Sequence, residues 1–170
     1  QPQQVAAGLH MRYHARAYII ADSASGQRVV FVTADSSCLF ESIHIGVLAK
    51  LRARYGDLYT EKNVNLNATH NHNSCGGTAW DYAYTLAAFG FKKNSYDAEV
   101  NGIFAAICRA HDSLAPGTVK LGRTELHNAS AQRSRIAFDL NPPHDKNAFP
   151  DAINPAVTVL RLAQAGKDIG

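Results

Sequence analysis

Apolar residues gather in two short β-branched runs near the start of the chain. Residues 16–22 (RAYIIAD) and residues 28–35 (RVVFVTAD) are each the length of one strand. The Ser and Gly residues that turns favour lie between them, at residues 23–27. We therefore predict a hairpin of two buried strands.

The spacing of apolar positions then changes to that of a helix. Over residues 39–54 the apolar side chains recur three or four positions apart, and Gly56 follows as a stop signal. Residues 63–69 (NVNLNAT) return to strict alternation, which is typical of a strand. This predicted strand runs directly into a loop that contains His70 and His72.

Further along the chain, helical spacing covers residues near 80–89 and 96–114, and strands are predicted at 118–126 and 156–162. Residues 134–155 hold most of the prolines and little periodicity, which predicts an extended surface segment. The mixture of strands and helices favours a mixed α/β fold built of layered sheets with flanking helices.

Length and composition narrow the classes of protein. The chain has 170 residues, of which 46% are hydrophobic, and this fits one domain or a large part of one. The net charge is only +3, with Lys and Arg scattered rather than clustered among aromatic residues, so nucleic acid is not an expected partner. The apolar runs are far shorter than the roughly 20 residues that cross a bilayer. Residues 163–170 look like a turn that leads toward a strand outside the chain.

Neither the amino-terminal residues nor the cysteines identify a cellular compartment. Residues 1–5 lack the basic-then-apolar layout of a secretory signal. The spacing of Cys38, Cys75 and Cys108 matches no disulfide framework or zinc ribbon. Cys108 falls within an apolar helical pattern, so we expect it to be a small buried hydrophobic residue.

His70 and His72 are the first candidates for chemistry. They are two positions apart, so on a continuing strand both imidazoles would project from the same face. Such a pair can supply two metal ligands, or one ligand and one acid/base group, because neutral imidazole binds zinc and has a pKa of about 6.5. Loop histidines that only bind neighbouring groups are the alternative, and a catalytic zinc ion needs three protein ligands.

Motifs along nearly the whole chain add a family resemblance. In chain order they are GLHMR at residues 8–12, ARAYI at 15–19, RVVFVTAD at 28–35, NVNLNATHNHNSCGG at 63–77, RAH at 109–111, LAPG at 114–117, QRS at 132–134, AFD at 137–139 and NP at 141–142. This set, in this order, resembles the neutral ceramidase family. Members are much longer, so residues 1–170 resemble the amino-terminal portion of the catalytic domain, which is incomplete on its own.

The resemblance implies roles for three residues. The family signature Thr-His-Thr-His-Ser-Gly-Pro-Gly-Gly aligns with residues 69–77, which implies that His70 is a zinc ligand and His72 an acid/base or transition-state contact. It also implies that Arg133 contacts the substrate or the developing oxyanion, where a fixed cation stabilises growing negative charge. Without the resemblance, a surface or loop-anchoring ion pair would be the simpler reading of Arg133.

The loops also depart from the family signature. Substitutions relative to the signature occur at Asn71, Asn73, Ser74, Cys75, Gln132 and Arg135, and two of them replace a Gly and a Pro of the histidine loop. Losing these two residues changes the backbone that the loop can adopt. The family's second His ligand, its Glu and Tyr ligands and its active-site Ser match no residue here. We therefore expect the other ligands to come from a continuation of the chain or from a separate cleaved chain.

The leading hypothesis is a zinc-dependent amidase that hydrolyses, or in reverse forms, the N-acyl amide of ceramide or a related lipid or lipopeptide. Its expected partners are this lipid-like substrate, with access from a membrane surface, and the remainder of the catalytic domain. We expect a secreted or extracytoplasmic location. One alternative is a nucleophilic hydrolase or acyltransferase that uses Cys75 with His72. Another is a metal-free, non-catalytic lipid-binding module.

Three other features carry weaker expectations. Asp35 would either orient a zinc-bound histidine or cap the helix that is predicted to begin near Cys38. His10 is expected to pack between its apolar neighbours rather than line a substrate entrance. The aromatic residues that follow the glycines would shape a groove for an acyl chain, although helix core is the expected role of Phe89 and Phe91.

Overall fold

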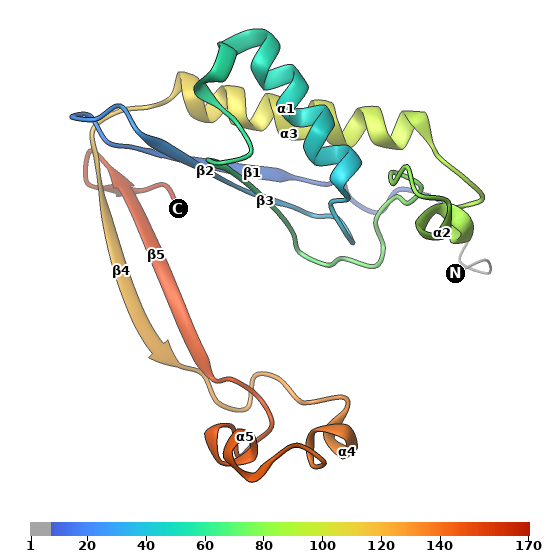
Figure 1. Cartoon of the computed structure of the whole chain (residues 1–170). Helices are drawn as coiled ribbons and strands as arrows, with labels where there is room; N and C mark the ends of the chain where they lie inside the picture. Colours follow the sequence, from blue (N-terminus) through green and yellow to red (C-terminus); the bar gives the residue numbers. More distant parts are fainter. Residues whose placement is uncertain (1–7) are drawn as a thin grey trace. The chain divides into compact units, whose positions relative to one another are not determined.

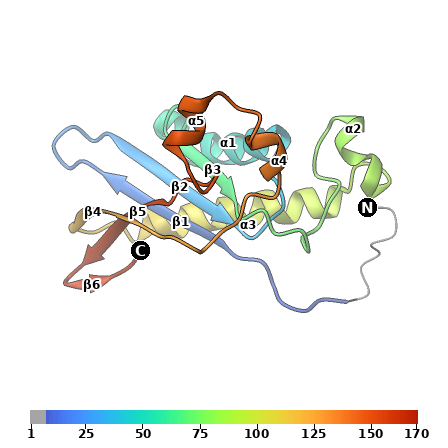
Figure 2. The same cartoon turned by 90° about the horizontal axis from the view of Figure 1, so that it is seen from below.

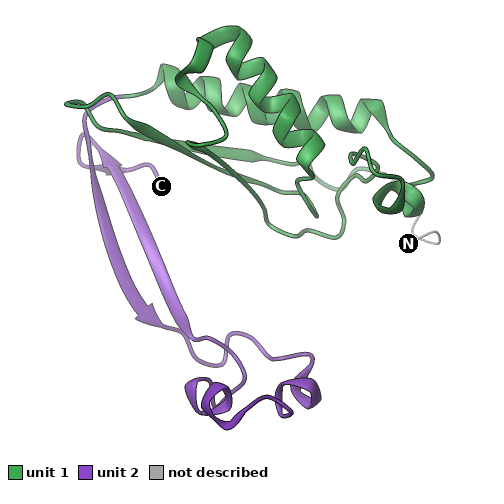
Figure 3. Ribbon diagram, viewed as in Figure 1, with its two compact units in different colours: residues 1–114 green, residues 115–170 purple. Residues whose placement is uncertain are grey.

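The computed structural model describes residues 8–170 and has a mixed α/β architecture, which confirms the predicted fold class. The chain forms two compact units that divide between Leu114 and Ala115, coloured green and purple in Figure 3. The amino-terminal residues considered for a secretory signal lie outside the described residues. Whether both units belong to one catalytic domain stays a prediction.

The first unit is built on a three-stranded sheet. Strands β1 (Ala15–Ala21) and β2 (Arg28–Ala34) form the predicted antiparallel hairpin, and β3 (Val64–Ala68) pairs with β2 in parallel. The sheet order is therefore β1-β2-β3, as the view in Figure 2 shows. Because side chains alternate along a strand, Val30 and Val32 lie on the same face and are fully buried.

Two helices cover one face of this sheet (Figure 1). They are α1 (Glu41–Tyr55) and α3 (Lys93–Asp112), and Gly56 ends α1 with a φ of +62°, as the sequence predicts. The short 3₁₀ turn Gly56–Leu58 follows. The buried core that helices and sheet share is formed by Val30, Val32, Ala34, Ile43, Val47, Leu51, Tyr59, Val64, Val100, Ile103 and Ile107. Cys108 is also buried, which confirms its predicted place.

Replacing Ile107 by valine should weaken this core measurably. Ile107 is 0% exposed, so Ile107→Val is expected to lower the free energy of unfolding by about 0.5–1.5 kcal/mol through loss of one buried methylene group. Urea unfolding of the purified chain measures the change. Ile45→Val on α1 is the matched control, because Ile45 is 44% exposed. Equal losses for the two variants would contradict the packing of α3 against the sheet.

The helix predicted near residues 80–89 is mostly absent. The structure has only one turn of α-helix, α2 (Tyr82–Thr85), and a 3₁₀ turn at Leu86–Ala88 that ends at Phe89 with a φ of +55°. Phe89 and Phe91 are exposed, so the expectation that they form helix core is wrong for the described residues. The physical reason is that the segment packs through a few ring contacts, such as Trp80 with Tyr96 of α3 and Tyr84 with Phe40, while most of its aromatic side chains stay exposed and do not offset their poor helix propensity.

The second unit is a long hairpin with a helical tip. Strands β4 (Gly117–Glu125) and β5 (Ala156–Gln164) pair along their whole lengths in antiparallel register, which confirms both predicted strands. The short strand β6 (Lys167–Asp168) pairs with β5. The turn expected within residues 163–170 is thus present and leads into this short strand, and a strand beyond Gly170 stays a prediction.

The segment between these two strands is less extended than predicted. It contains the short helices α4 (Arg135–Phe138) and α5 (Pro143–Ala148). Pro143 opens α5 at its first position, where the fixed φ of proline favours a helix start and no N–H is needed. A proline of this segment thus starts a helix, whereas we expected the prolines only to mark extended structure. No helix within residues 8–170 is long and apolar enough to span a bilayer.

Candidate metal and active site

The candidate site lies where the parallel strands β2 and β3 end. The loops that leave these strands stay side by side, because the Thr69 N–H donates to the Ala34 carbonyl over 3.0 Å and the Asn71 N–H donates to the Ser36 carbonyl over 3.0 Å. The carboxyl ends of parallel strands are a frequent place for binding sites in α/β proteins. This arrangement brings the His70 side chain to the backbone of residues 36–37.

His70 has the geometry of a metal ligand. Its Nδ1 atom lies 2.9 Å from the Ser37 carbonyl oxygen, which can only accept, so Nδ1 carries the proton and donates it to this bond. The Nε2 atom then keeps a free lone pair, and ligating histidines in proteins usually show this pattern. The ring is exposed rather than packed into hydrocarbon. Its backbone φ is +62°, a left-handed conformation that is uncommon outside glycine.

His72 faces His70 across the loop. The two Nε2 atoms are 2.9 Å apart, and the rings meet edge to face at 79° with centroids 4.6 Å apart. Because the His70 Nε2 atom holds a lone pair, the His72 Nε2 atom would donate the proton in this contact. The predicted proximity of the two imidazoles is confirmed, but its cause differs. Strand β3 ends at Ala68, and the turn at His70 rather than a continuing strand brings the rings together.

The described residues do not form a complete zinc site. No three His, Cys, Asp or Glu side chains come together as a metal-binding group in the part of the chain that the structure describes. A catalytic zinc ion needs three protein ligands, so any such site requires donors beyond His70 and His72. The orientation of His70 fits zinc, and its assignment as a ligand stays a prediction.

Residues of the histidine loop that differ from the family signature form hydrogen bonds that shape the loop. The Ser37 N–H donates to the Ser74 Oγ over 2.8 Å, and the Asn73 N–H donates to the Asn71 Oδ1 over 2.9 Å. The Tyr13 hydroxyl donates to the Asn73 carbonyl over 2.8 Å. The polar side chains that replace the family residues thus give this loop side-chain contacts of its own.

The glycine at position 77 is required by close packing. Its φ is +78°, and a Cβ atom there would lie 2.8 Å from the Gly90 carbonyl oxygen and 2.7 Å from the Lys92 Cγ. The Lys92 N–H also donates to the Gly77 carbonyl over 2.7 Å. The histidine loop is therefore tied to the segment that leads into α3.

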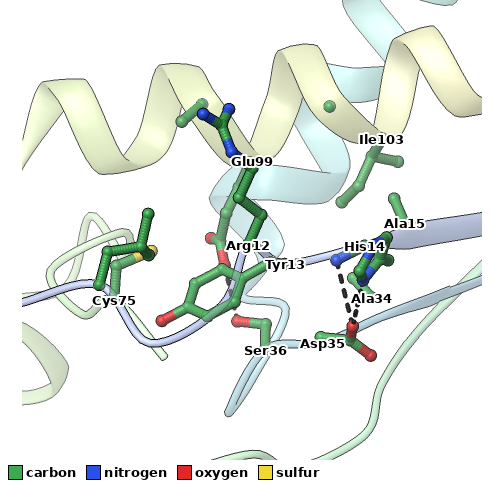
Figure 4. A pocket seen from close by; sticks show the side chains of 13 residues that line it. Arg12, Tyr13, His14, Ala15, Ala34, Asp35, Ser36, Cys75, Glu99 and Ile103 are labelled. Atoms are coloured by element: carbon green, nitrogen blue, oxygen red, sulfur yellow. Dashed lines mark hydrogen bonds and ion pairs between the residues drawn. The ribbon is translucent and has the colours of Figure 1, made fainter. Parts of the chain in front are cut away.

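A cavity of about 470 Å³ lies beside the loop (Figure 4). It is lined by apolar side chains together with the polar or charged residues Arg12, Tyr13, His14, Asp35, Ser36, Cys75 and Glu99. The Ser36 Oγ donates to the Glu99 Oε1 over 2.6 Å, whereas the Glu99 Oε2 is buried and makes no hydrogen bond. Burial raises the pKa of Glu99, and the hydroxyl groups of Ser36 and Thr78 partly offset this rise.

The structure gives no support to Cys75 as a nucleophile. Burial, and secondarily the Glu99 carboxylate, raise the pKa of the Cys75 thiol, whereas an activated cysteine has a lowered pKa. Within the described residues no hydrogen bond joins this thiol to His72, the base that the mechanism would need.

Two further expectations are corrected. Asp35 neither contacts His70 nor caps α1, whose first turn follows Phe40; instead it accepts hydrogen bonds from Arg16 Nη1 over 2.8 Å and from the His14 backbone. The Arg16 guanidinium lowers the pKa of Asp35. His10 is exposed, so its expected packing between apolar neighbours is wrong, since those neighbours are exposed too.

Arg133 lies in the second unit, on the loop that follows β4. Its side chain is exposed, and among residues 8–170 it forms no ion pair, in contrast to Arg135, which binds Asp139 over 2.8 Å. The neighbouring Gln132 braces the loop, because its Oε1 accepts from the Ser134 N–H over 3.0 Å. The Arg133 guanidinium is therefore free to bind an anionic group.

Comparisons with known proteins agree on one family. Residues 1–170 match the family described as neutral/alkaline non-lysosomal ceramidase, N-terminal. The chain is 40% identical to the neutral ceramidase of Pseudomonas aeruginosa over 167 residues, covering 98% of this chain and 25% of that protein. It is 35% identical over 169 residues to the neutral ceramidase of Mycobacterium tuberculosis, covering 98% of this chain and 26% of that protein. It is 37% identical over 160 residues to neutral ceramidase 1 of Arabidopsis thaliana, covering 94% of this chain and 20% of that protein.

A solved structure gives the same result. The crystal structure of neutral ceramidase from Pseudomonas aeruginosa superposes with a TM-score of 0.93 at 40% identity, covering 98% of this chain and 26% of that one. The fold and the loop define a mixed α/β protein with a histidine pair at the carboxyl ends of parallel strands. This chain belongs to the neutral/alkaline non-lysosomal ceramidase family, and it matches the family's amino-terminal part. It spans between a fifth and about a quarter of the length of these curated relatives.

Proposed function

We propose that this chain is the amino-terminal portion of a zinc-dependent amidase that hydrolyses the N-acyl amide of ceramide or of a related lipid or lipopeptide. The same site would form the amide in reverse. The observation that carries the proposal is His70, whose Nδ1–H is bound to the Ser37 carbonyl, so that the lone pair of its Nε2, which accepts from His72 in this structure, is the one that would bind a metal ion. Membership of a family whose named members are neutral ceramidases supports the substrate class.

The proposed roles follow from the chemistry of each side chain. A bound zinc ion acts as a Lewis acid and lowers the pKa of bound water to about 7. His70 would hold the ion through Nε2, and donors from the remainder of the catalytic domain would complete its coordination. His72, within hydrogen-bonding distance of His70, would deliver a proton to the leaving amine. Arg133 would bind the negative charge that develops on the carbonyl oxygen.

Removing the metal tests this proposal directly. In the full-length protein, purified without chelator, we expect about one zinc ion per molecule, in line with a single catalytic site of this kind. Turnover of a ceramide with a fluorescent acyl chain should disappear after chelation and return when zinc is added back. Elemental analysis and chromatographic detection of the released fatty acid measure the two results.

The other outcomes separate the alternatives. A protein that binds no zinc and has no turnover would be the metal-free lipid-binding module. Turnover that survives chelation but is lost on thiol alkylation would favour the cysteine mechanism. Either result would reject the zinc amidase.

Access to the substrate from a membrane surface is a further part of the proposal. The segment after the histidine loop exposes Trp80, Tyr82 and Phe89 beside two lysines, Lys92 and Lys93. Amphipathic rings next to basic side chains suit the interface between water and lipid. The secreted or extracytoplasmic location stays a prediction.

A further inference from the structure

The backbone bend at Ser36 and Ser37 fixes the ring of His70. The Ser37 carbonyl accepts from the His70 Nδ1–H over 2.9 Å, and the Ser36 carbonyl accepts from the Asn71 N–H over 3.0 Å. The acceptor at Nδ1 sets the tautomer and the orientation of a ligating imidazole. Any displacement of this bend would therefore move the lone pair of His70.

The side chains of Glu99 and Ser74 each accept a hydrogen bond from this bend. The Ser36 hydroxyl donates to the Glu99 Oε1 over 2.6 Å, and the Ser37 N–H donates to the Ser74 Oγ over 2.8 Å. Ser36 is only 3% exposed, so water competes little for its hydroxyl group. A short hydrogen bond to a carboxylate is among the strong hydrogen bonds in proteins.

Glu99 comes from a rigid part of the fold. It lies on α3, where the next residue Val100 and, one turn on, Ile103 are buried in the core. Figure 4 shows its side chain reaching from the helix toward Ser36 at the edge of the cavity. The carboxyl group is thus fixed by core packing rather than by the flexible histidine loop.

Keeping a carboxyl group at this place has a cost in stability. The Glu99 Oε2 is buried without a hydrogen bond, and burial raises the pKa of this group. An apolar side chain at the same position of α3 would avoid that cost. The hydroxyl groups of Ser36 and Thr78 offset part of this cost, and the hydrogen bond to Ser36 connects Glu99 to the backbone that holds His70.

We propose that Glu99 is a positioning residue for the metal ligand His70. Through the Ser36 hydroxyl it holds the Ser37 carbonyl, which keeps the proton on Nδ1 of His70 and leaves Nε2 directed for the metal. The identity of the metal as zinc rests on the proposed function. The hydrogen-bonded path itself does not.

Zinc affinity of the full-length protein tests this role. Glu99→Ala and Ser36→Ala are each expected to weaken zinc binding roughly 10- to 100-fold, the usual loss when an outer partner of a ligating histidine is removed. Glu99→Gln keeps an oxygen acceptor for Ser36 and should restore most of the affinity. The double variant should bind zinc no more weakly than the single variant with the lower affinity, because both changes break the same hydrogen bond. Competition with a chelator measures the dissociation constants.

Asp97→Ala is the matched control. Asp97 is another carboxylate of α3, two positions from Glu99, and it pairs with Lys93 on the exposed surface. Its removal should leave zinc affinity unchanged. An unchanged affinity in Glu99→Ala, or losses that add fully in the double variant, would overturn the proposal. If Glu99→Ala fails to fold, Ser36→Ala decides, because it removes only a hydroxyl group.

A measurement without metal separates this inference from the proposed function. Nitrogen-15 NMR of the histidine rings in the metal-free full-length protein should show His70 as the Nδ1–H tautomer. In Glu99→Ala and Ser36→Ala the two tautomers should mix, whereas in Asp97→Ala they should not. If the wild-type protein binds no zinc, the proposed function fails, and the tautomer result alone upholds or rejects the role of Glu99.

Discussion

His70→Ala in the full-length protein is expected to reduce amide hydrolysis to the level of the metal-free protein. The substitution removes the Nε2 lone pair that would bind zinc, and a site that loses one of three protein ligands no longer holds a catalytic ion tightly. Zinc content and turnover of a labelled ceramide should fall together. The thermal midpoint, measured on metal-free samples of both proteins, should fall only modestly, because the side chain is exposed and the change costs one hydrogen bond and places alanine at a φ of +62°.

His70→Asn sharpens this experiment. Asparagine tolerates the left-handed backbone at this position better than alanine does, and its amide can still donate to the Ser37 carbonyl, but it has no atom that corresponds to Nε2. It should therefore preserve the loop and still lack zinc. His144→Ala is the control, since His144 is an exposed histidine of α5 that contacts Asp145. Turnover retained in His70→Asn would reject the ligand assignment.

Arg133→Ala should produce the second large loss, about 10²- to 10³-fold in kcat, the typical effect of removing one group that stabilises an oxyanion. The Arg133 side chain is exposed and has no ion pair among the described residues, so its removal should not destabilise the second unit. Steady-state kinetics with a labelled ceramide should show kcat falling more than KM rises, because the interaction strengthens in the transition state.

Arg133→Lys gives the graded comparison. Lysine keeps the charge but not the planar fork of donors, so we expect an intermediate loss. Arg123→Ala on β4 removes another exposed cation of the same unit and should have little effect. A kcat for Arg133→Ala close to that of Arg123→Ala would show that Arg133 does not contact the reacting group.

The elements that the sequence predicted best are those whose apolar side chains pack against another element of the same unit. The hairpin of β1 and β2, the strand β3 and the helices α1 and α3 share one core, so the periodicity of each was sufficient to predict it. The helix expected near residues 80–89 was wrong because most of its aromatic side chains stay exposed instead of joining this core. Tertiary packing, not local spacing, decides whether such a segment becomes a helix.

The candidate site was predicted in part. The strand-to-loop position and the family signature indicated His70 and His72, and the structure brings their rings together. The left-handed turn at His70 was not predictable, because the alternation of the preceding strand suggests continued extension. The expectation for Asp35 was mistaken for a different reason, because its partner Arg16 lies on the neighbouring strand and is brought to it by the pairing of β1 with β2.

Glu99 was missed for a different reason. A single acidic residue in an amphipathic helix is normally assigned to the solvent face. The available signal was its place between Tyr96 and Ile103, on the face of α3 that is turned toward the core. Only the coordinates show that Ser36, 63 positions earlier, lies opposite this carboxyl group.

The parallel pairing of β2 with β3 has a consequence for how such a sheet can grow. Within the described residues β3 has a strand neighbour on one side only, so its other side offers free backbone N–H and C=O groups for strand addition. The histidine loop leaves from the tip of β3 and not from its flank. Further strands could therefore widen the sheet while the loops that leave the ends of β2 and β3 keep their mutual spacing.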